Sequence, residues 1–430
     1  MCSNLNSWPR WILSALLLLP PWVVASAAPA PYGEDFVRTG AEWREGVGRW
    51  RELATASSGA VDTEPFIRQM ETLEISAGPY ADGLAEPLAS LGRHYRQQGD
   101  YEQAVSLYRR AMHVVRINEG LKSERQIPLL RELLLCYRQA GELESLDERY
   151  DYFFHLFGEG RPPYNPARVQ AALEYMRWQR EALRRELGVE KRRIVALIDL
   201  NEGMLESLRL QADIPYSWRR DVSYSQLLNY YLLLQRFKPA LSEQQLLTSR
   251  EYMGGAQGVQ SMEDQKLQSR LRSAAAQGAT MLQELAVAAA RAGPIEEASV
   301  KLALADWYFW NGKRQQAVAE YASVVAMLND AGEHSLLQHW LGTPVELPDN
   351  GVFWQPELIE DEATVIVQAD YDVSASGRVS GLQAQLLPGA KEQSIQGFRR
   401  KLASTLFRPR WVNGEPEAVG GLRRRYQLLK

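Results

Sequence analysis

The chain has 430 residues, more than one compact core normally holds, so two or three folded domains are expected. Hydrophobic residues make up 45% and charged residues 24%, proportions typical of folded rather than disordered proteins. The formal net charge of −4 argues against a strongly basic nucleic-acid-binding protein, and we expect no nucleic-acid partner.

Residues 1–27 have the organisation of a secretory signal peptide. A basic residue, Arg10, precedes the apolar run Trp11–Leu19, and the small residues Ala25–Ala27 follow. This order predicts cleavage after Ala27 and hence a periplasmic protein with no stable membrane span after cleavage. The alternative is an uncleaved inner-membrane anchor over 11–30, because about 20 apolar residues can cross a bilayer.

A short Pro/Ala-rich tether at 28–38 leads into a predicted helical array at 39–335. Apolar residues recur in this array every three or four positions, and strand-like alternation is nearly absent. Glycines at 254–255 and the pair Gly293-Pro294 predict breaks between helices.

A helix–turn–helix repeat begins near Leu88. Its apolar and small residues fall at Leu88, Leu91, Gly92, Tyr95, Gly99, Tyr101, Ala104, Tyr108 and Ala111. This spacing resembles the tetratricopeptide repeat family, whose units are helix pairs of about 34 residues. Clear repeats are predicted at 85–118, 127–160 and 298–331, with degenerate helix pairs at 166–250. The resemblance implies a scaffold that holds peptides or proteins on its concave face, with no enzymatic activity.

The first helix of each repeat should line that concave face. The repeat register predicts six binding residues there: Arg93, Arg96, Gln97, Arg131, Arg138 and Gln139. Guanidinium groups bind carboxylates through two parallel hydrogen bonds, so an acidic or C-terminal peptide segment would suit this surface. The alternative is a solvated arginine face. Phe309 and Trp310 of the last repeat fall on the same side, where core packing is the favoured interpretation.

After a predicted linker at 336–361, residues 362–430 have the composition of a small ββαβ domain. Strands are expected at Thr364–Val373 and Arg378–Leu386, joined by a turn, then a helix at 392–405 and a last strand at Gly421–Leu428. The predicted fold class is therefore mainly α, a tetratricopeptide-like solenoid of helical hairpins followed by a small α+β domain.

The hairpin at 372–379 and the segment 406–416 resemble the TonB carboxy-terminal domain. The resemblance implies that an exposed strand edge pairs with a short peptide of an outer-membrane receptor. The candidate edge is Gly421, Leu422, Arg423, Arg424, Arg425, Tyr426, Gln427 and Leu428. No histidine lies in the N-terminal apolar stretch, and repeats occupy the place of a Pro-rich spacer. A borrowed interaction fold is therefore favoured, with an accessory part of a TonB-type transport system as the alternative.

A second basic set lies in the same domain and could contact anionic lipid headgroups or glycans. Its members are Arg399, Arg400, Lys401, Arg408, Arg410, Arg423, Arg424 and Arg425. The alternative is a solvated face that protects the sheet edge from aggregation.

Signatures of catalysis are missing from the sequence. The five histidines have no metal-ligand spacing, and no nucleophile elbow, phosphate loop or dinucleotide fingerprint occurs. We therefore expect no catalytic residue, metal or cofactor, and an unrecognised envelope enzyme is the least favoured interpretation. Cys136 would be the single thiol after signal cleavage, and its apolar neighbours predict a buried, inert side chain.

Overall fold

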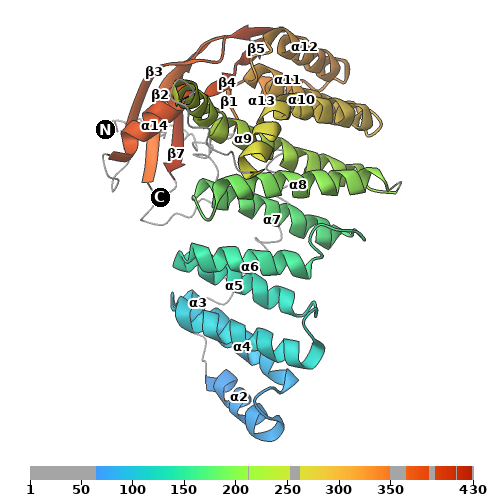
Figure 1. Ribbon diagram of the computed structural model, residues 1–430, viewed down its shortest axis with the longest axis vertical. Coiled ribbons are helices and arrows are strands. Elements are labelled where there is room, and N and C mark those ends of the chain that lie inside the picture. The colour runs from blue at the N-terminus through green and yellow to red at the C-terminus, as the bar shows by residue number, and fades with distance from the viewer. Residues whose placement is uncertain are drawn as a thin grey trace, which may run out of the picture.

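The computed structural model describes residues 64–211, 213–251, 262–348, 365–386, 393–412 and 414–428 (Figure 1). The predicted signal peptide at 1–27 and tether at 28–38 lie outside these ranges. Within the described ranges, every helix is too short or too polar to span a bilayer.

Helices stacked as antiparallel pairs form most of the molecule (Figure 1). The helices before the long α9 are α2 (Glu64–Ala77), the 3-10 turn η1 (Asp82–Leu84), α3 (Ala85–Gln97), α4 (Tyr101–Glu119), α5 (Gln126–Ala140), α6 (Leu143–Leu156), α7 (Pro166–Arg184) and α8 (Glu190–Arg209). The later ones are α9 (Tyr216–Glu251), α10 (Met262–Ala289), α11 (Pro294–Trp310), α12 (Arg314–Asp330) and α13 (His334–Leu341). The pairing confirms the predicted solenoid of helical hairpins.

The α3–α4 hairpin shows how the repeat spacing produces the fold. Gly99 has a left-handed φ of 81°, and the carboxylate of Asp100 then accepts a hydrogen bond from the Gln103 amide at 3.2 Å, so α4 begins with a side-chain cap. A Cβ atom at Gly92 would lie 3.0 Å from the Tyr108 ring. The glycine therefore lets the two helices approach closely, and Tyr108 fills the space between them.

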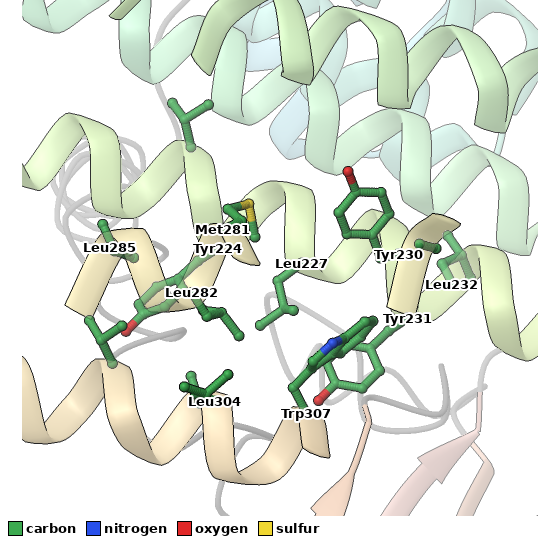
Figure 2. Packing of buried hydrophobic residues seen from close by; sticks show 14 of the residues in the cluster. Tyr224, Leu227, Tyr230, Tyr231, Leu232, Met281, Leu282, Leu285, Leu304 and Trp307 are labelled. Carbon is green, nitrogen blue, oxygen red and sulfur yellow. The ribbon is translucent and has the colours of Figure 1, made fainter. Parts of the chain in front are cut away.

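A large core lies between α9, α10 and α11 (Figure 2). Tyr231 of α9 meets Trp307 of α11 edge-on at 4.6 Å between ring centroids. The Trp307 indole also donates to the Ala275 carbonyl at 2.9 Å, and Gly278 leaves room for that ring. Because α9 runs for 36 residues, this part of the array departs from short, equal helix pairs.

The first half of the linker predicted at 336–361 is wrong, because residues 336–348 belong to a helix and a strand and the turn between them. Helix α13 begins at His334, and β1 (Val345–Leu347) is a fully buried strand that pairs with β4 (Leu406–Arg408). Trp340 and Leu341 join the core of the array. Their apolar side chains need burial, which a solvated linker would not provide. Residues 349–361 lie outside the described ranges.

The C-terminal module has a three-stranded antiparallel sheet in the order β3-β2-β7. Its strands are β2 (Val365–Val373), β3 (Val379–Leu386) and β7 (Val419–Leu428), with α14 (Gln393–Ser404) against β3. Phe398 and Leu402 of α14 are buried with the inward side chains of the sheet. The ββαβ order is confirmed, and the short strands β1, β4, β5 (Arg410–Val412) and β6 (Glu415–Glu417) add to it.

Candidate interaction surfaces

Three of the arginines predicted to bind a peptide are engaged inside the array. The Arg96 Nε donates to Glu132 at 3.1 Å, and Arg131 forms an ion pair with Glu174 at 3.0 Å. Arg138 donates to both carboxylate oxygens of Glu181, at 2.8 and 3.1 Å. These contacts join α3 to α5 and α5 to α7, so we name them the arginine ladder.

The acidic members of this ladder on α7 are buried. The side chains of Glu174 and Glu181 are each only 6% exposed. Burial acts to raise the pKa of Glu181, but the charge and hydrogen bonds of Arg138, with Arg185 and Arg177, outweigh it and lower that pKa. Glu181 therefore stays ionised at neutral pH and keeps the Arg138 fork occupied.

In the predicted acidic-peptide site, the guanidinium groups of Arg96, Arg131 and Arg138 already pair with intramolecular carboxylates, with which an acidic peptide would have to compete. The other three predicted residues, Arg93, Gln97 and Gln139, are exposed. Arg93 donates to Ser90 at 3.2 Å, and Gln139 accepts from Arg96 at 3.3 Å.

Part of the ladder has a regular spacing in the sequence. The partner of Arg131 and the partner of Arg138 each lie 43 residues further on, and so does Gln139 from Arg96. The common spacing of 43 residues therefore identifies the two ion pairs between α5 and α7, whereas Arg96 and its carboxylate partner Glu132 are 36 residues apart.

The last strand lies where the sequence placed it, at an edge of the sheet. Among the described strands, β7 pairs with β2 alone, from Val365↔Leu428 to Val373↔Val419. Gly421 and Arg423 are exposed, whereas Tyr426 is buried. Arg423 also forms an ion pair with Asp370 at 2.6 Å. The candidate edge from Gly421 to Leu428 therefore has one side of its backbone without a partner strand among those described.

Two members of the second basic set are not surface groups, so neither a lipid-facing nor a solvated role applies to them. Arg408 pairs with Asp306 of α11 at 3.0 Å, and both side chains are only 1% exposed. The same carboxylate accepts from the Tyr321 hydroxyl at 2.7 Å. Arg424 pairs with Glu346 at 2.5 Å, and Glu346 is fully buried. We call these two pairs the buried junction, because Asp306–Arg408 joins the array to the module.

The other described basic residues of that set differ in their exposure to solvent. Arg399 is half-buried and donates to the Ala384 carbonyl at 2.9 Å, and Arg410 is half-buried. Arg400 and Lys401 are exposed on α14. The described members of the set are therefore dispersed and form no continuous basic face with Arg408 and Arg424; the Arg425 side chain lies outside the described residues.

The aromatic pair at the end of α11 packs in the core, as the favoured interpretation held. Trp310 contacts the Tyr231 ring edge-on at 4.9 Å. Phe309 is 8% exposed, and its ring would lie 3.0 Å from a Cβ atom at Gly377, in the turn between β2 and β3. The turn between β2 and β3 of the module thus packs against helix α11 of the last repeat.

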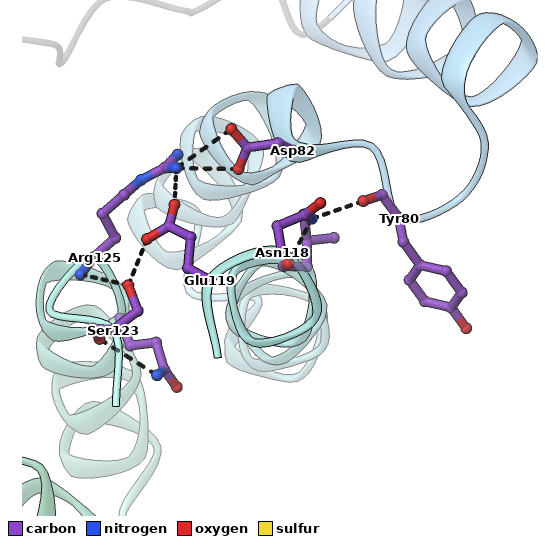
Figure 3. Close-up of polar contacts among 8 residues, drawn as sticks. Tyr80, Asp82, Asn118, Glu119, Ser123 and Arg125 are labelled. Atoms are coloured by element: carbon purple, nitrogen blue, oxygen red, sulfur yellow. Dashed lines mark hydrogen bonds and ion pairs between the residues drawn. The ribbon is translucent and has the colours of Figure 1, made fainter. Parts of the chain in front are cut away.

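An exposed apolar rim, which the sequence analysis did not single out, lies near the start of the described chain. Its members are Ile75, Tyr80, Ile117 and Leu121, with 88%, 50%, 50% and 71% of their surface exposed. Figure 3 shows Tyr80 pointing away from the polar contacts that hold its loop. There the Asn118 side chain donates to the Tyr80 carbonyl at 2.8 Å, and Arg125 pairs with Asp82 at 3.0 Å. Ile75 and Ile117 lie near the C-terminal ends of α2 and α4, and Tyr80 and Leu121 lie in the loops that follow these helices.

Cys136 is buried, and burial raises the pKa of its thiol to about 12. The thiol is therefore protonated at neutral pH and a poor nucleophile. Over the described ranges, no three side chains of the His, Cys, Asp and Glu types gather closely enough to hold a metal ion.

Comparison with known proteins gives one family match. A family model described as "Tetratricopeptide repeat" matches residues 88–122, which span most of α3, all of α4 and the start of the next loop. The match falls on the repeat predicted at 85–118 and supports that prediction. No curated protein matches the chain.

Two solved structures of a Podosopora anserina putative kinesin light chain with nearly identical TPR-like repeats are similar to this chain. Both are 14% identical and cover 57% of this chain and 95% of their own. The TM-score is 0.35 for one and 0.34 for the other, a single-residue variant of the same protein.

Proposed function

We propose that the protein is a periplasmic interaction scaffold that binds peptide or protein partners through its helical array and its C-terminal module. The periplasmic location rests on the signal-peptide organisation of residues 1–27. Binding of proteins is the usual role of tetratricopeptide arrays, and the match at 88–122 supports it here.

The observation that carries the proposal is the edge of β7 within a module that is fixed to the array. An unpaired strand edge offers a row of backbone donors and acceptors to an extended peptide. The Asp306–Arg408 pair and the ring contact of Trp411 with Tyr321, at 4.8 Å, hold the module against α11 and α12. A fixed edge loses little entropy when a partner strand adds to it, which favours binding.

Site-specific photo-cross-linking in envelope preparations tests this proposal. A photoreactive residue replaces Arg423 at the β7 edge, Gln139 on the face of α5, or Thr280 as an exposed control on α10. We expect covalent adducts with other proteins at Arg423 or Gln139 and none at Thr280. Absence of adducts at both test positions, or equal labelling at all three, would contradict the scaffold function.

A narrower candidate is an accessory role in a TonB-type outer-membrane transport system. It is supported by the resemblance of 372–379 and 406–416 to the TonB carboxy-terminal domain and by the edge position of β7. Deleting the module is a poor test, because it would leave Asp306 without Arg408. The sharper test asks whether adducts at Arg423 contain outer-membrane receptors; adducts that contain only other proteins reject this candidate.

A further inference from the structure

A groove in the middle of the array has a composition that the proposed function does not explain. It has a volume of about 610 Å³ and is lined by α6, α7, α8 and the loop between α6 and α7. Grooves of this size accommodate a side chain with its neighbouring backbone.

The floor of the groove is aromatic. The Phe154 and Tyr175 rings stack with their centroids 4.0 Å apart and an interplanar angle of 2°. Both rings line the groove, Phe154 as a buried and Tyr175 as a half-buried side chain. The face of an aromatic ring attracts a cation, above all a planar guanidinium, so the outer face of this stacked pair is the surface that a guanidinium would cover.

A glycine in the wall keeps the groove open. Gly203 lies in the middle of α8, where glycine costs about 1 kcal/mol relative to alanine. Two other glycines inside helices of the array, Gly92 and Gly278, face the close rings of Tyr108 and Trp307. A Cβ atom at Gly203 would meet nothing within 4 Å. Packing does not demand this glycine, whereas a large side chain would project into the groove.

The rim carries more acidic than basic side chains, and one carboxylate has no cation paired with it. Glu159 is engaged by His155 and by Arg161, the basic residue of the rim, and Asp199 is engaged by Arg270. Asp151 accepts from the Tyr175 hydroxyl at 2.7 Å and forms no ion pair within the described residues.

The surroundings of Asp151 disfavour its charge. Burial, with the neighbouring charges of Asp147 and Glu148, raises the pKa of Asp151 against the opposing effects of the Tyr175 hydroxyl and the more distant Arg193. Arg193 is itself engaged, because it pairs with Asp147 at 2.6 Å. A cation bound beside Asp151 would relieve the cost of its charge.

The geometry points to a binding groove for a basic peptide segment of a partner protein, whose arginine side chain lies on the Phe154–Tyr175 pair and donates to Asp151. This inference rests on the proposed scaffold function and adds a second class of partner, of opposite charge to the acidic peptide that the sequence suggested. The Asp151 oxygen already held by Tyr175 is fixed in position, which prepares the carboxylate for a guanidinium.

Fluorescence anisotropy with the purified full chain and labelled hexa-arginine tests the inference at 0.15 M salt, where long-range attraction is screened. Hexa-lysine and the uncharged hexa-citrulline are the comparison probes. We expect hexa-arginine to bind most tightly and hexa-citrulline least. Equal binding of hexa-arginine and hexa-lysine would contradict stacking on the aromatic floor, and equal binding of hexa-citrulline would contradict the ionic contact.

Two variants locate the binding. Asp151→Asn removes the charge and keeps an acceptor for Tyr175, and we expect about tenfold weaker binding, as for one charge-assisted hydrogen bond. Its matched control, Glu144→Gln, makes the same charge change at an exposed site on α6 that does not line the groove and is not among the charges that act on Asp151. Equal weakening by both variants would show general attraction only and overturn the inference.

Gly203→Leu fills the groove without any change of charge and should weaken binding about tenfold or more, since the aromatic floor becomes covered. Gln315→Leu, exposed on α12, is the control. A melting temperature at or above that of the parent protein verifies folding, because leucine is a better helix former than glycine. Unchanged binding by Gly203→Leu refutes the groove. That result leaves the adducts expected at Arg423 unaffected, so it is distinct from failure of the scaffold function.

Discussion

The arginine ladder and the buried junction are built from the same pairs of side chains in different surroundings. In the ladder, Arg131 and Arg138 keep 29% and 28% of their side chains exposed. In the junction, Arg408 and Asp306 are each 1% exposed. Water can solvate either of these ladder arginines if its partner is lost, but it cannot reach Arg408 or Asp306.

This comparison shows that the burial of an ion pair determines how strongly its loss affects the stability of the fold. A partly exposed pair adds modestly to stability, since solvent screens it and ordering the side chains costs entropy. A buried pair gives little net stability as a pair but makes loss of either partner costly. The ladder pairs therefore contribute modestly to the stability of contacts between neighbouring repeats. At the junction, removing either the module or the array would leave a buried charge without its partner.

The largest expected effect is at the junction. Arg408→Met leaves the Asp306 carboxylate buried without a counter-charge, and we expect a loss of about 3–5 kcal/mol in the free energy of unfolding. Urea denaturation measures it. The double variant Asp306→Asn with Arg408→Met should recover much of the loss. If the free energy of unfolding of Arg408→Met lay within about 1 kcal/mol of the parent value, as expected for an exposed pair, the proposed difference between junction and ladder would be wrong.

The next effect tests packing beside the junction. Gly278→Ala would place a Cβ atom 2.6 Å from the Trp307 ring. We expect destabilisation of about 1–3 kcal/mol from overpacking. The matched change Gly203→Ala, also inside a helix but facing open space, should stabilise by up to about 1 kcal/mol. Thermal and urea unfolding of the two variants should move in opposite directions; shifts of the same sign would be inconsistent with this packing.

The contribution of the Arg138–Glu181 pair of the ladder to the free energy of unfolding should depend on pH. The folded-state pKa of Glu181 is lowered below the ordinary glutamate value of 4.5. Its contribution to stability is therefore complete above about pH 4.5 and is lost as the pH falls through the folded-state pKa. At neutral pH we expect Glu181→Gln to cost about 1–2 kcal/mol, from hydrogen bonds to a charged group. The difference between parent and variant should shrink on acidification, and a constant difference from pH 7 to about pH 3 would refute it.

The smallest effect is expected at the exposed pair of the β7 edge. Arg423 is 70% exposed in its pair with Asp370, so solvent screens the attraction. Arg423→Gln should leave the denaturation midpoint unchanged within error, as the cross-linking experiment at this position requires. A clear loss of stability would mean that this edge pair behaves like the junction.

The sequence was most informative where one residue type at a fixed spacing has a local consequence. The spacing from Leu88 to Ala111 predicted the α3–α4 hairpin, because Gly92 and Gly99 act through close approach and backbone conformation. The hairpin of β2 and β3 followed from strand composition around a turn. The start of the linker was mispredicted because β1 has only three residues and depends on a partner, β4, far along the chain.

The binding groups were harder to predict for the same reason. Whether Arg138 is free or paired depends on Glu181, on a helix of the next repeat. For Arg408, the partner Asp306 is 102 residues away, and no periodicity links them. The groove between α6, α7 and α8 likewise combines residues from three helices and a loop.

By itself, the sequence determined the helical hairpins, the tetratricopeptide repeat near Leu88 and the ββαβ order, since these depend on contacts between neighbours in the chain. Only the tertiary structure decided which charges face solvent and which are neutralised inside. The physical reason is that burial and pairing depend on distances between side chains from different elements, and Asp306 with Arg408 shows how far apart those elements are in the chain.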